Sequence, residues 1–285
     1  MKLMRVGALG QERPAVRMAD GSVIDVSSVV NDYDSAWLAA GGMAALESRL
    51  QEGTDGFPAI DIGAERIGAP IARPGHILAI GLNYADHAAE AGMDVPSEPI
   101  LFTKAPSSYC GPNDTVLIPR TSEKSDWEVE LGVVIGKEAS YVADEAAAMD
   151  HVAGYCIVND VSERDFQINR GPTWVKGKSA KTFCPTGPWL VSRDEIADPQ
   201  ALAMKLSVNG KSCQNGNTST MIFGVAHLVW YLSQFMVLEA GDLIATGTPP
   251  GVGMGMKPPQ YLAAGDVMEL EIDGLGGQRQ EVAQA

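Results

Sequence analysis

From Ile77 to the end of the chain, short apolar segments alternate with turns that are rich in Gly and Pro. This pattern predicts many short strands, because runs of this length between turn residues favour strands. The strands that we expect are 77–80, 100–103, 128–135, 152–158, 189–191, 205–208, 243–246 and 267–272. Asn209-Gly210 predicts a hairpin turn after the 205–208 strand, because both residues readily adopt the positive φ of a tight turn.

Helical segments are fewer, and we expect them at 85–91, 143–149 and 221–238. Many strands with few helices indicate a β-rich α+β fold rather than a regular βαβ array. The 221–238 segment is apolar, but it is short for a membrane span and contains polar residues, so we interpret it as a buried helix.

The first 70 residues differ from the rest and predict a small N-terminal domain. A short strand is expected at 23–26, and a helix at 35–50 that Gly41-Gly42 interrupts. Residues 53–75 are rich in Gly and Pro and are interpreted as a linker. The predicted organisation is therefore a small domain at 1–70 and a catalytic domain at 71–285.

The charge balance limits the possible partners of the chain. With 21 basic and 36 acidic residues, the formal net charge is −15, which disfavours nucleic acids and anionic membranes. The N-terminus lacks the apolar core of a signal peptide, and the four cysteines form no C-x-x-C pair. We therefore expect a cytoplasmic protein with free thiols.

Three carboxylates are the strongest candidates for a metal site. Glu128 and Glu130 are two residues apart at the head of an apolar run, so a strand places them on one face. Asp160 follows the next apolar run, 152–158, among many polar residues. Oxygen donors of this kind suit Mg²⁺ or Mn²⁺ better than Zn²⁺. The alternative is that the two glutamates form the solvent face of an edge strand.

Other polar groups are weaker candidates when each is taken alone. His87 and Glu90 would share one face of a helix, which suits a general base and its carboxylate partner, or a surface ion pair. Lys178 lies in a lysine-rich loop flanked by aromatic residues and could stabilise an enolate or oxyanion. Gly247 and Thr248 follow a strand, where backbone N–H groups and a hydroxyl could bind a carboxylate.

Taken together, these motifs resemble the fumarylacetoacetate hydrolase family over about residues 70–285. Residues 81–87 resemble the family's lid segment with its catalytic histidine, and Glu128, Glu130 and Asp160 resemble its metal triad. Further matches are an arginine–glutamine pair, an active-site lysine, and a loop that binds the substrate carboxylate. In this sequence they are Arg164, Gln167, Lys178 and the segment 247–251. One departure is Lys181, where similar members tend to carry an acidic or small residue; we favour a solvent-facing side chain there.

The resemblance implies a β-sandwich roll, a homodimer or dimer of dimers, and bound Mg²⁺, Mn²⁺ or Ca²⁺. It also implies hydrolysis of the C3–C4 bond of a 2,4-diketo acid, with His87 activating water and Lys178 stabilising the enolate. The sequence resembles bacterial enzymes of sugar-acid catabolism, such as L-rhamnose breakdown, most closely. The expected substrate is therefore a 2,4-diketo-3-deoxy sugar acid such as L-2,4-diketo-3-deoxyrhamnonate, which gives pyruvate and lactate.

Other activities of the same site remain open. Oxaloacetate decarboxylation and isomerisation of a 2-hydroxy-dienedioate need the metal and the enolate, but they need no attacking water. Ureidoglycolate lyase is a further alternative. A metal-binding protein without catalysis is an alternative of another class, against which His87, Lys178 and the three acids argue. Fold alone does not choose among these reactions.

Overall fold

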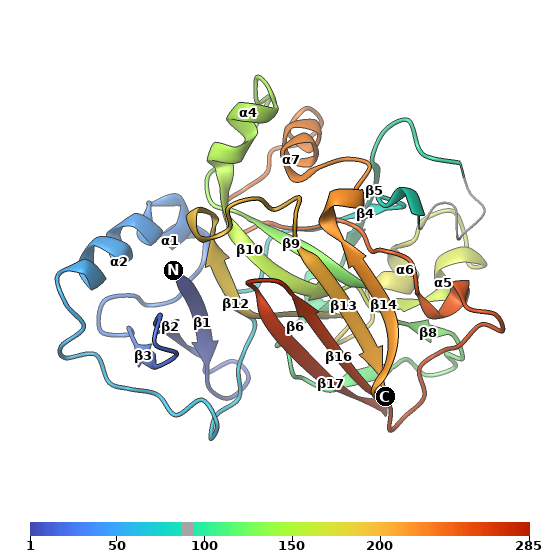
Figure 1. Cartoon of the computed structure of the whole chain (residues 1–285), viewed down its shortest axis with the longest axis horizontal. Helices are drawn as coiled ribbons and strands as arrows, with labels where there is room; N and C mark the ends of the chain where they lie inside the picture. The colour runs from blue at the N-terminus through green and yellow to red at the C-terminus, as the bar shows by residue number, and fades with distance from the viewer. Residues whose placement is uncertain (87–93) are drawn as a thin grey trace.

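The computed structural model of the chain describes residues 1–86 and 94–285. Within these residues, a ten-stranded sheet runs in the order β3-β2-β1-β12-β10-β9-β15-β4-β5, and β6 pairs with β12 (Figure 1). Its strands are β1 Lys2–Val6, β2 Arg13–Arg17, β3 Val23–Asp25, β4 Ile77–Gly81, β5 Ile100–Lys104, β6 Tyr109–Cys110, β9 Val129–Ile135, β10 Val152–Asn159, β12 Cys184–Ser192 and β15 Leu243–Ala245.

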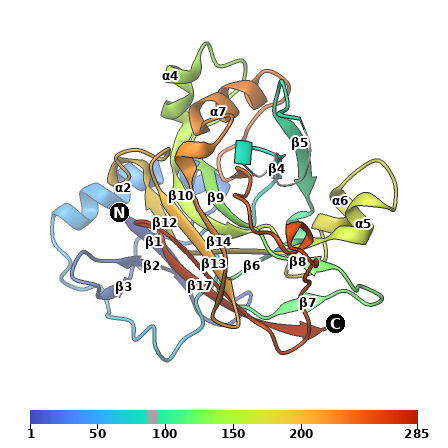
Figure 2. The ribbon, with the colours of Figure 1, turned by 45° about the vertical axis from the view of Figure 1, so that its right-hand side comes forward.

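A second, five-stranded sheet has the order β14-β13-β16-β17-β7, and a small ladder joins β8 to β11. These strands are β7 Val116–Ile118, β8 Ser125–Asp126, β11 Ser162–Glu163, β13 Ala203–Val208, β14 Lys211–Asn217, β16 Val267–Ile272 and β17 Gly276–Gln284. In Figure 2, β13, β14 and β17 lie across the strands around β10 and β12 of the larger sheet. β16 and β17 contact β10, which places the second sheet against the centre of the first.

In the described part of the chain, the α-helices are short and lie around the sheets. They are α1 Ser35–Ala39, α2 Gly42–Gln51, α4 Glu145–Ala148, α5 Arg164–Ile168, α6 Val175–Lys178 and α7 Val225–Ser233. Short 3₁₀ turns are η1 Pro106–Ser108, η2 Met149–His151, η3 Arg193–Glu195, η4 Thr218–Thr220 and η5 Gly253–Gly255. None of the helices in residues 1–86 and 94–285 is long and apolar enough to cross a membrane.

Strand β9 shows why the centre of the large sheet is apolar throughout. Leu131 and Val133 belong to the core shared with the second sheet, whereas Val134 belongs to a core on the opposite side. Both faces of the strand are therefore covered, because successive side chains point to opposite faces. The continuous apolar run in the sequence reflects this two-sided burial.

Several sequence predictions are confirmed. The β-rich fold is confirmed, and Asn209 (φ 52°) and Gly210 (φ 74°) form the turn between β13 and β14. The expected break in the first helix occurs at Gly41, whose φ of 76° separates α1 from α2. The division at residue 70 remains a prediction. β1 pairs with β12 and so joins the N-terminal strands to the large sheet.

The helix predicted at 221–238 is wrong in extent, because α7 covers only Val225–Ser233. Before the helix, the amide and carbonyl of Phe223 bond to the side chain of Asn83. After the helix, Leu238 exchanges two backbone hydrogen bonds with Ala139. Tertiary hydrogen bonds therefore override the helical tendency of this apolar segment at both ends.

Candidate active site

The register of two neighbouring strands brings the three predicted acids together. β9 and β10 are antiparallel, with Glu130 opposite Val158, and the Asp160 N–H donates to the Glu128 carbonyl at 2.9 Å. One carboxylate oxygen of Glu128, one of Glu130 and one of Asp160 lie within 4.8 Å of one another. All three residues are at most 5% exposed. The alternative of a solvent-facing edge strand is therefore wrong for these glutamates.

Two of the acids are neutralised by buried cations. The Lys178 Nζ donates to Glu128 Oε2 at 2.8 Å and to Asp160 Oδ2 at 2.7 Å. The other oxygen of Asp160 accepts from Lys104 Nζ at 2.5 Å, and Glu128 Oε1 lies 2.7 Å from Arg164 Nη2. Burial lowers the pKa of Lys178, but Asp160 and Glu128 raise it by more, so the ammonium stays charged.

Glu130 is different, because it has no ion pair among the described residues. Its carboxylate accepts one hydrogen bond, from the Gly247 N–H at 2.8 Å. Burial and the charges of Asp160 and Glu128 raise the pKa of Glu130 well above its ordinary value. An additional cation beside Glu130 would remove this repulsion. The residues therefore fit an oxygen-coordinated divalent metal held by Glu128, Glu130 and Asp160.

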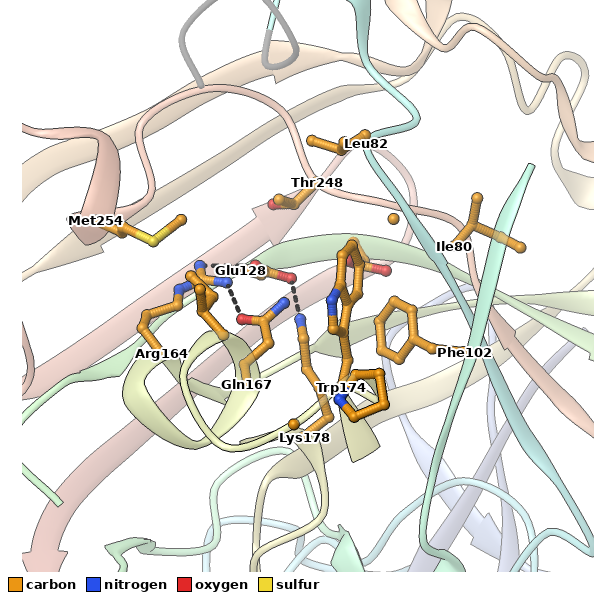
Figure 3. A pocket seen from close by; sticks show the side chains of 15 residues that line it. Ile80, Leu82, Phe102, Glu128, Arg164, Gln167, Trp174, Lys178, Thr248 and Met254 are labelled. Carbon is orange, nitrogen blue, oxygen red and sulfur yellow. Dashed lines mark hydrogen bonds and ion pairs between the residues drawn. The ribbon is translucent and has the colours of Figure 1, made fainter. Parts of the chain in front are cut away.

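Short helices deliver the other polar groups to the same place. Gly177 packs α6 so closely against α5 that a Cβ would lie 2.5 Å from the Glu163 carbonyl oxygen. This contact carries Lys178, at the end of α6, toward the acids (Figure 3). On α5, Arg164 bonds to Asp126 through Nε at 2.8 Å and to the Gln167 Oε1 through Nη1 at 3.0 Å.

Glu128 and Glu130 line a cavity of about 360 Å³, and Asp160 lies beside them. The polar lining of the cavity consists of Glu128, Glu130, Arg164, Gln167, Lys178 and Thr248. Its walls are largely apolar, as the side chains around the opening in Figure 3 show. A charged base inside apolar walls is typical of an enzyme site that orients a small polar molecule.

Gly247 and Thr248 also lie where the sequence predicts them, at the end of β15. The positive φ of Gly247 (102°) and its contact with Asn83 leave no room for a side chain. The Thr248 hydroxyl donates to the Val129 carbonyl at 2.9 Å and accepts from Gln214 at 2.7 Å. Thr248 lines the cavity, and its predicted role in binding a substrate carboxylate stays a prediction.

His87 and Glu90 lie outside the described residues, so their predicted roles stay predictions. Lys181 is exposed, as expected. Sequence reasoning missed Lys104 and Asp126. Lys104 ends an apolar strand with no acid near it in sequence. Asp126 lies two residues before Glu128 and binds Arg164 as well as the backbone N–H groups of 253 and 254.

Comparison with known proteins identifies the family of the chain. Residues 76–283 match the family described as "Fumarylacetoacetate (FAA) hydrolase C-terminal". A Burkholderia multivorans protein, whose name refers to a hydrolase and gives no substrate, is 57% identical over 281 residues, or 98% of each chain.

Two solved structures are similar over the whole chain. One, from Mycobacterium abscessus, is described as a probable 2-hydroxyhepta-2,4-diene-1,7-dioate isomerase. It is 35% identical with a TM-score of 0.81, and the match covers 100% of this chain and 99% of that chain. The other is the maleylpyruvate hydrolase of Sphingobium sp. SYK-6 in complex with manganese(II) and pyruvate. It has 27% identity, a TM-score of 0.83 and full coverage of both chains. The protein therefore belongs to the fumarylacetoacetate hydrolase family.

Proposed function

We propose that the protein is a metal-dependent hydrolase that cleaves the C3–C4 bond of a 2,4-diketo acid to pyruvate and a second acid. The candidate substrate is a 2,4-diketo-3-deoxy sugar acid such as L-2,4-diketo-3-deoxyrhamnonate, which would give lactate. The observation that carries the proposal is the buried cluster of three acids and Lys178, of which Glu128, Glu130 and Lys178 line a cavity. The manganese and pyruvate bound to the similar maleylpyruvate hydrolase support the same chemistry.

Glu128, Glu130 and Asp160 would hold the metal, for which Mg²⁺, Mn²⁺ and Ca²⁺ are the candidates. Bound there, a divalent ion would supply the positive charge that binds a 2-oxo carboxylate and stabilises its enolate. Lys178 adds a fixed ammonium beside the same acids. Gln167 uses its amide oxygen for Arg164, so its NH₂ group is the part that can donate to a substrate oxygen.

In the proposed reaction, His87, oriented by Glu90, takes a proton from water, and the resulting hydroxide adds to the C4 carbonyl. The C3–C4 bond then breaks, and its electron pair forms the enolate of pyruvate. Lys178 stabilises the enolate oxygen, and protonation at C3 completes pyruvate. The C4 fragment leaves as the second carboxylic acid.

Isomerisation of a 2-hydroxy-dienedioate is the second candidate, because a similar structure is described as an isomerase of this kind. The reaction would use the same acids and Lys178, but it would need no water. Oxaloacetate decarboxylation and ureidoglycolate lyase activity are further alternatives at the same site.

The test is an assay of the purified protein with Mg²⁺ against 2,4-diketo acids, oxaloacetate, a 2-hydroxy-dienedioate and ureidoglycolate. Pyruvate release from a diketo acid, coupled to lactate dehydrogenase, is the expected result. Glu128→Ala is the control, since it removes one metal ligand. Pyruvate from oxaloacetate alone, or a dienedioate that isomerises without pyruvate release, would contradict the proposal in favour of the corresponding alternative.

A further inference from the structure

The cavity is divided into a charged base and an uncharged wall. The wall side chains include Ile80, Leu82, Phe102, Ile168, Trp174 and Met254. Among the described residues that line the cavity, the cationic side chains are those of Arg164 and Lys178. Both already contact Glu128 at the base. The described wall therefore provides no cation for a second carboxylate.

Two cationic side chains that neighbour the lining residues in the sequence, those of Arg170 and Lys176, have partners outside the cavity. Arg170 pairs with Asp165 at 3.2 Å, and its guanidinium lies 4.8 Å from the ring centre of Phe166. The Lys176 Nζ donates to the Arg170 carbonyl oxygen. Neither side chain lines the cavity. They therefore do not change the apolar character of the wall.

The aromatic part of the wall is held in place by packing. The rings of Phe102 and Trp174 are 5.2 Å apart, and the Trp174 ring lies so close to Gly81 that a Cβ there would be 2.4 Å away. Gly81 thus makes the space that the indole occupies. Ile168 also lines the cavity and leaves 54% of its surface exposed, so it lies at the rim.

We infer that this wall selects diketo acids whose distal end, beyond C4, is short and uncharged, and rejects dicarboxylic substrates. The inference rests on the proposed function, in which the 2-oxo acid end of the substrate lies on the charged base. A distal carboxylate would then lose its hydration against apolar atoms and gain no ionic partner from the described wall residues, which is costly. A methyl or hydroxyethyl end would bury apolar surface there.

The first experiment measures binding, so it does not depend on turnover. Isothermal titration of the Mg²⁺-loaded protein compares 2-oxoheptanoate with 2-oxoheptanedioate, which differ only at C7 and lack the C4 carbonyl that is attacked. We expect the monoacid to bind at least about tenfold more tightly, a difference of about 1.4 kcal/mol. Equal affinities, tighter binding of the diacid, or no detectable binding of the monoacid would overturn the inference.

The second experiment measures hydrolysis of 2,4-dioxoheptanoate and 2,4-dioxoheptanedioate. We expect kcat/KM to favour the monoacid at least about tenfold, in line with the binding preference. If neither compound releases pyruvate, the proposed function is in doubt, while the binding comparison still decides the inference. If both release pyruvate at equal kcat/KM, the proposed function holds and the inference fails.

A charge placed at Ile168 tests whether this wall contacts the distal end of the substrate. Ile168→Arg is expected to raise the affinity for 2-oxoheptanedioate at least about fivefold relative to Ile168→Gln, which adds polarity without charge. Ile168 is half-exposed, so both variants should fold, and thermal unfolding curves verify this. A folded Ile168→Arg protein with an unchanged preference would overturn the assignment of this wall to the distal end of the substrate.

Discussion

The N-terminal strands and the cavity both contain clusters of acids and cations, yet the two clusters differ in how their acids are paired. Near β1 and β2, five carboxylates form partly exposed ion pairs, and each of these five has an arginine partner. The pairs are Arg5–Asp32, Arg13–Asp25, Arg13–Glu65, Arg66–Glu12 and Arg66–Asp114. In the cavity the acids are buried, and Glu130 has no ionic partner among the described residues.

The pKa shifts of one glutamate from each cluster have opposite signs. Burial raises the pKa of Glu12, but the hydrogen bond from Arg66 and the charges of Arg5 and Arg66 lower it by more. Burial and neighbouring acids raise the pKa of Glu130. A cluster in which every acid has a cationic partner stabilises the fold, whereas a cluster with a buried acid that lacks such a partner is suited to bind a cation. The predictions below test this contrast.

The largest effect is expected for Glu130→Gln. The variant should lose Mg²⁺ binding and at least about 10³-fold in activity, because it removes the one acid of the triad that has no ion pair within the described part of the chain. The free energy of unfolding of its metal-free form should be about 1 kcal/mol higher than that of the wild type, because the repulsion with Asp160 and Glu128 is removed. Titration calorimetry and urea unfolding, with exposed Glu269→Gln as control, measure both effects. Unchanged Mg²⁺ affinity would refute the proposed metal site.

Lys178→Met should lower turnover by about 10²–10³-fold, the cost of removing one preorganised charge beside an enolate. Mg²⁺ binding should persist, because the three acids remain and lose a competing cation. Steady-state kinetics and titration calorimetry separate these effects, and the exposed Lys181→Met is the matched control. A normal rate in Lys178→Met would remove this lysine from the mechanism.

Lys104→Met should destabilise the metal-free protein by about 3 kcal/mol, because it leaves one buried oxygen of Asp160 without its cation. Added Mg²⁺ should recover part of this loss, so the rise in melting temperature with Mg²⁺ should be larger than in the wild type. Lys205→Met breaks an exposed pair with Glu271 and should change stability by less than about 1 kcal/mol. Equal losses of stability in the two variants would show that Lys104 contributes through the packing of its side chain and not through its ion pair with Asp160.

The smallest effect concerns pH and the N-terminal pairs. The pKa of Glu12 is lowered in the folded state, so its stabilisation is present above the ordinary value of 4.5 and is lost as pH falls below it. Glu12→Gln should therefore cost about 1 kcal/mol near neutral pH and nothing in acid. Urea unfolding over a pH series measures the difference. A cost that persists in acid would show that the Arg66 ion pair is not its source.

Much of the site follows from local sequence patterns. Glu128 and Glu130 lie at the head of an apolar strand, and Asp160 follows the next one, so antiparallel pairing of the two strands is enough to bring the acids together. The amide-rich strand β17 was missed, because the buried inward positions 278 and 280 are glutamines. These side chains bond to the backbone of 157 and 112, which no local pattern reveals.

The sequence by itself determined the β-rich fold, the acids at the strand ends and the break at Gly41, because strand alternation and turn chemistry act over a few residues. Only the tertiary structure decided that α7 stops at Ser233, that Lys104 neutralises Asp160, and that Glu130 has no ionic partner in residues 1–86 and 94–285. These outcomes depend on groups far apart in the chain. Their physical reason is that burial makes every charge and hydrogen bond depend on the partners that folding brings near.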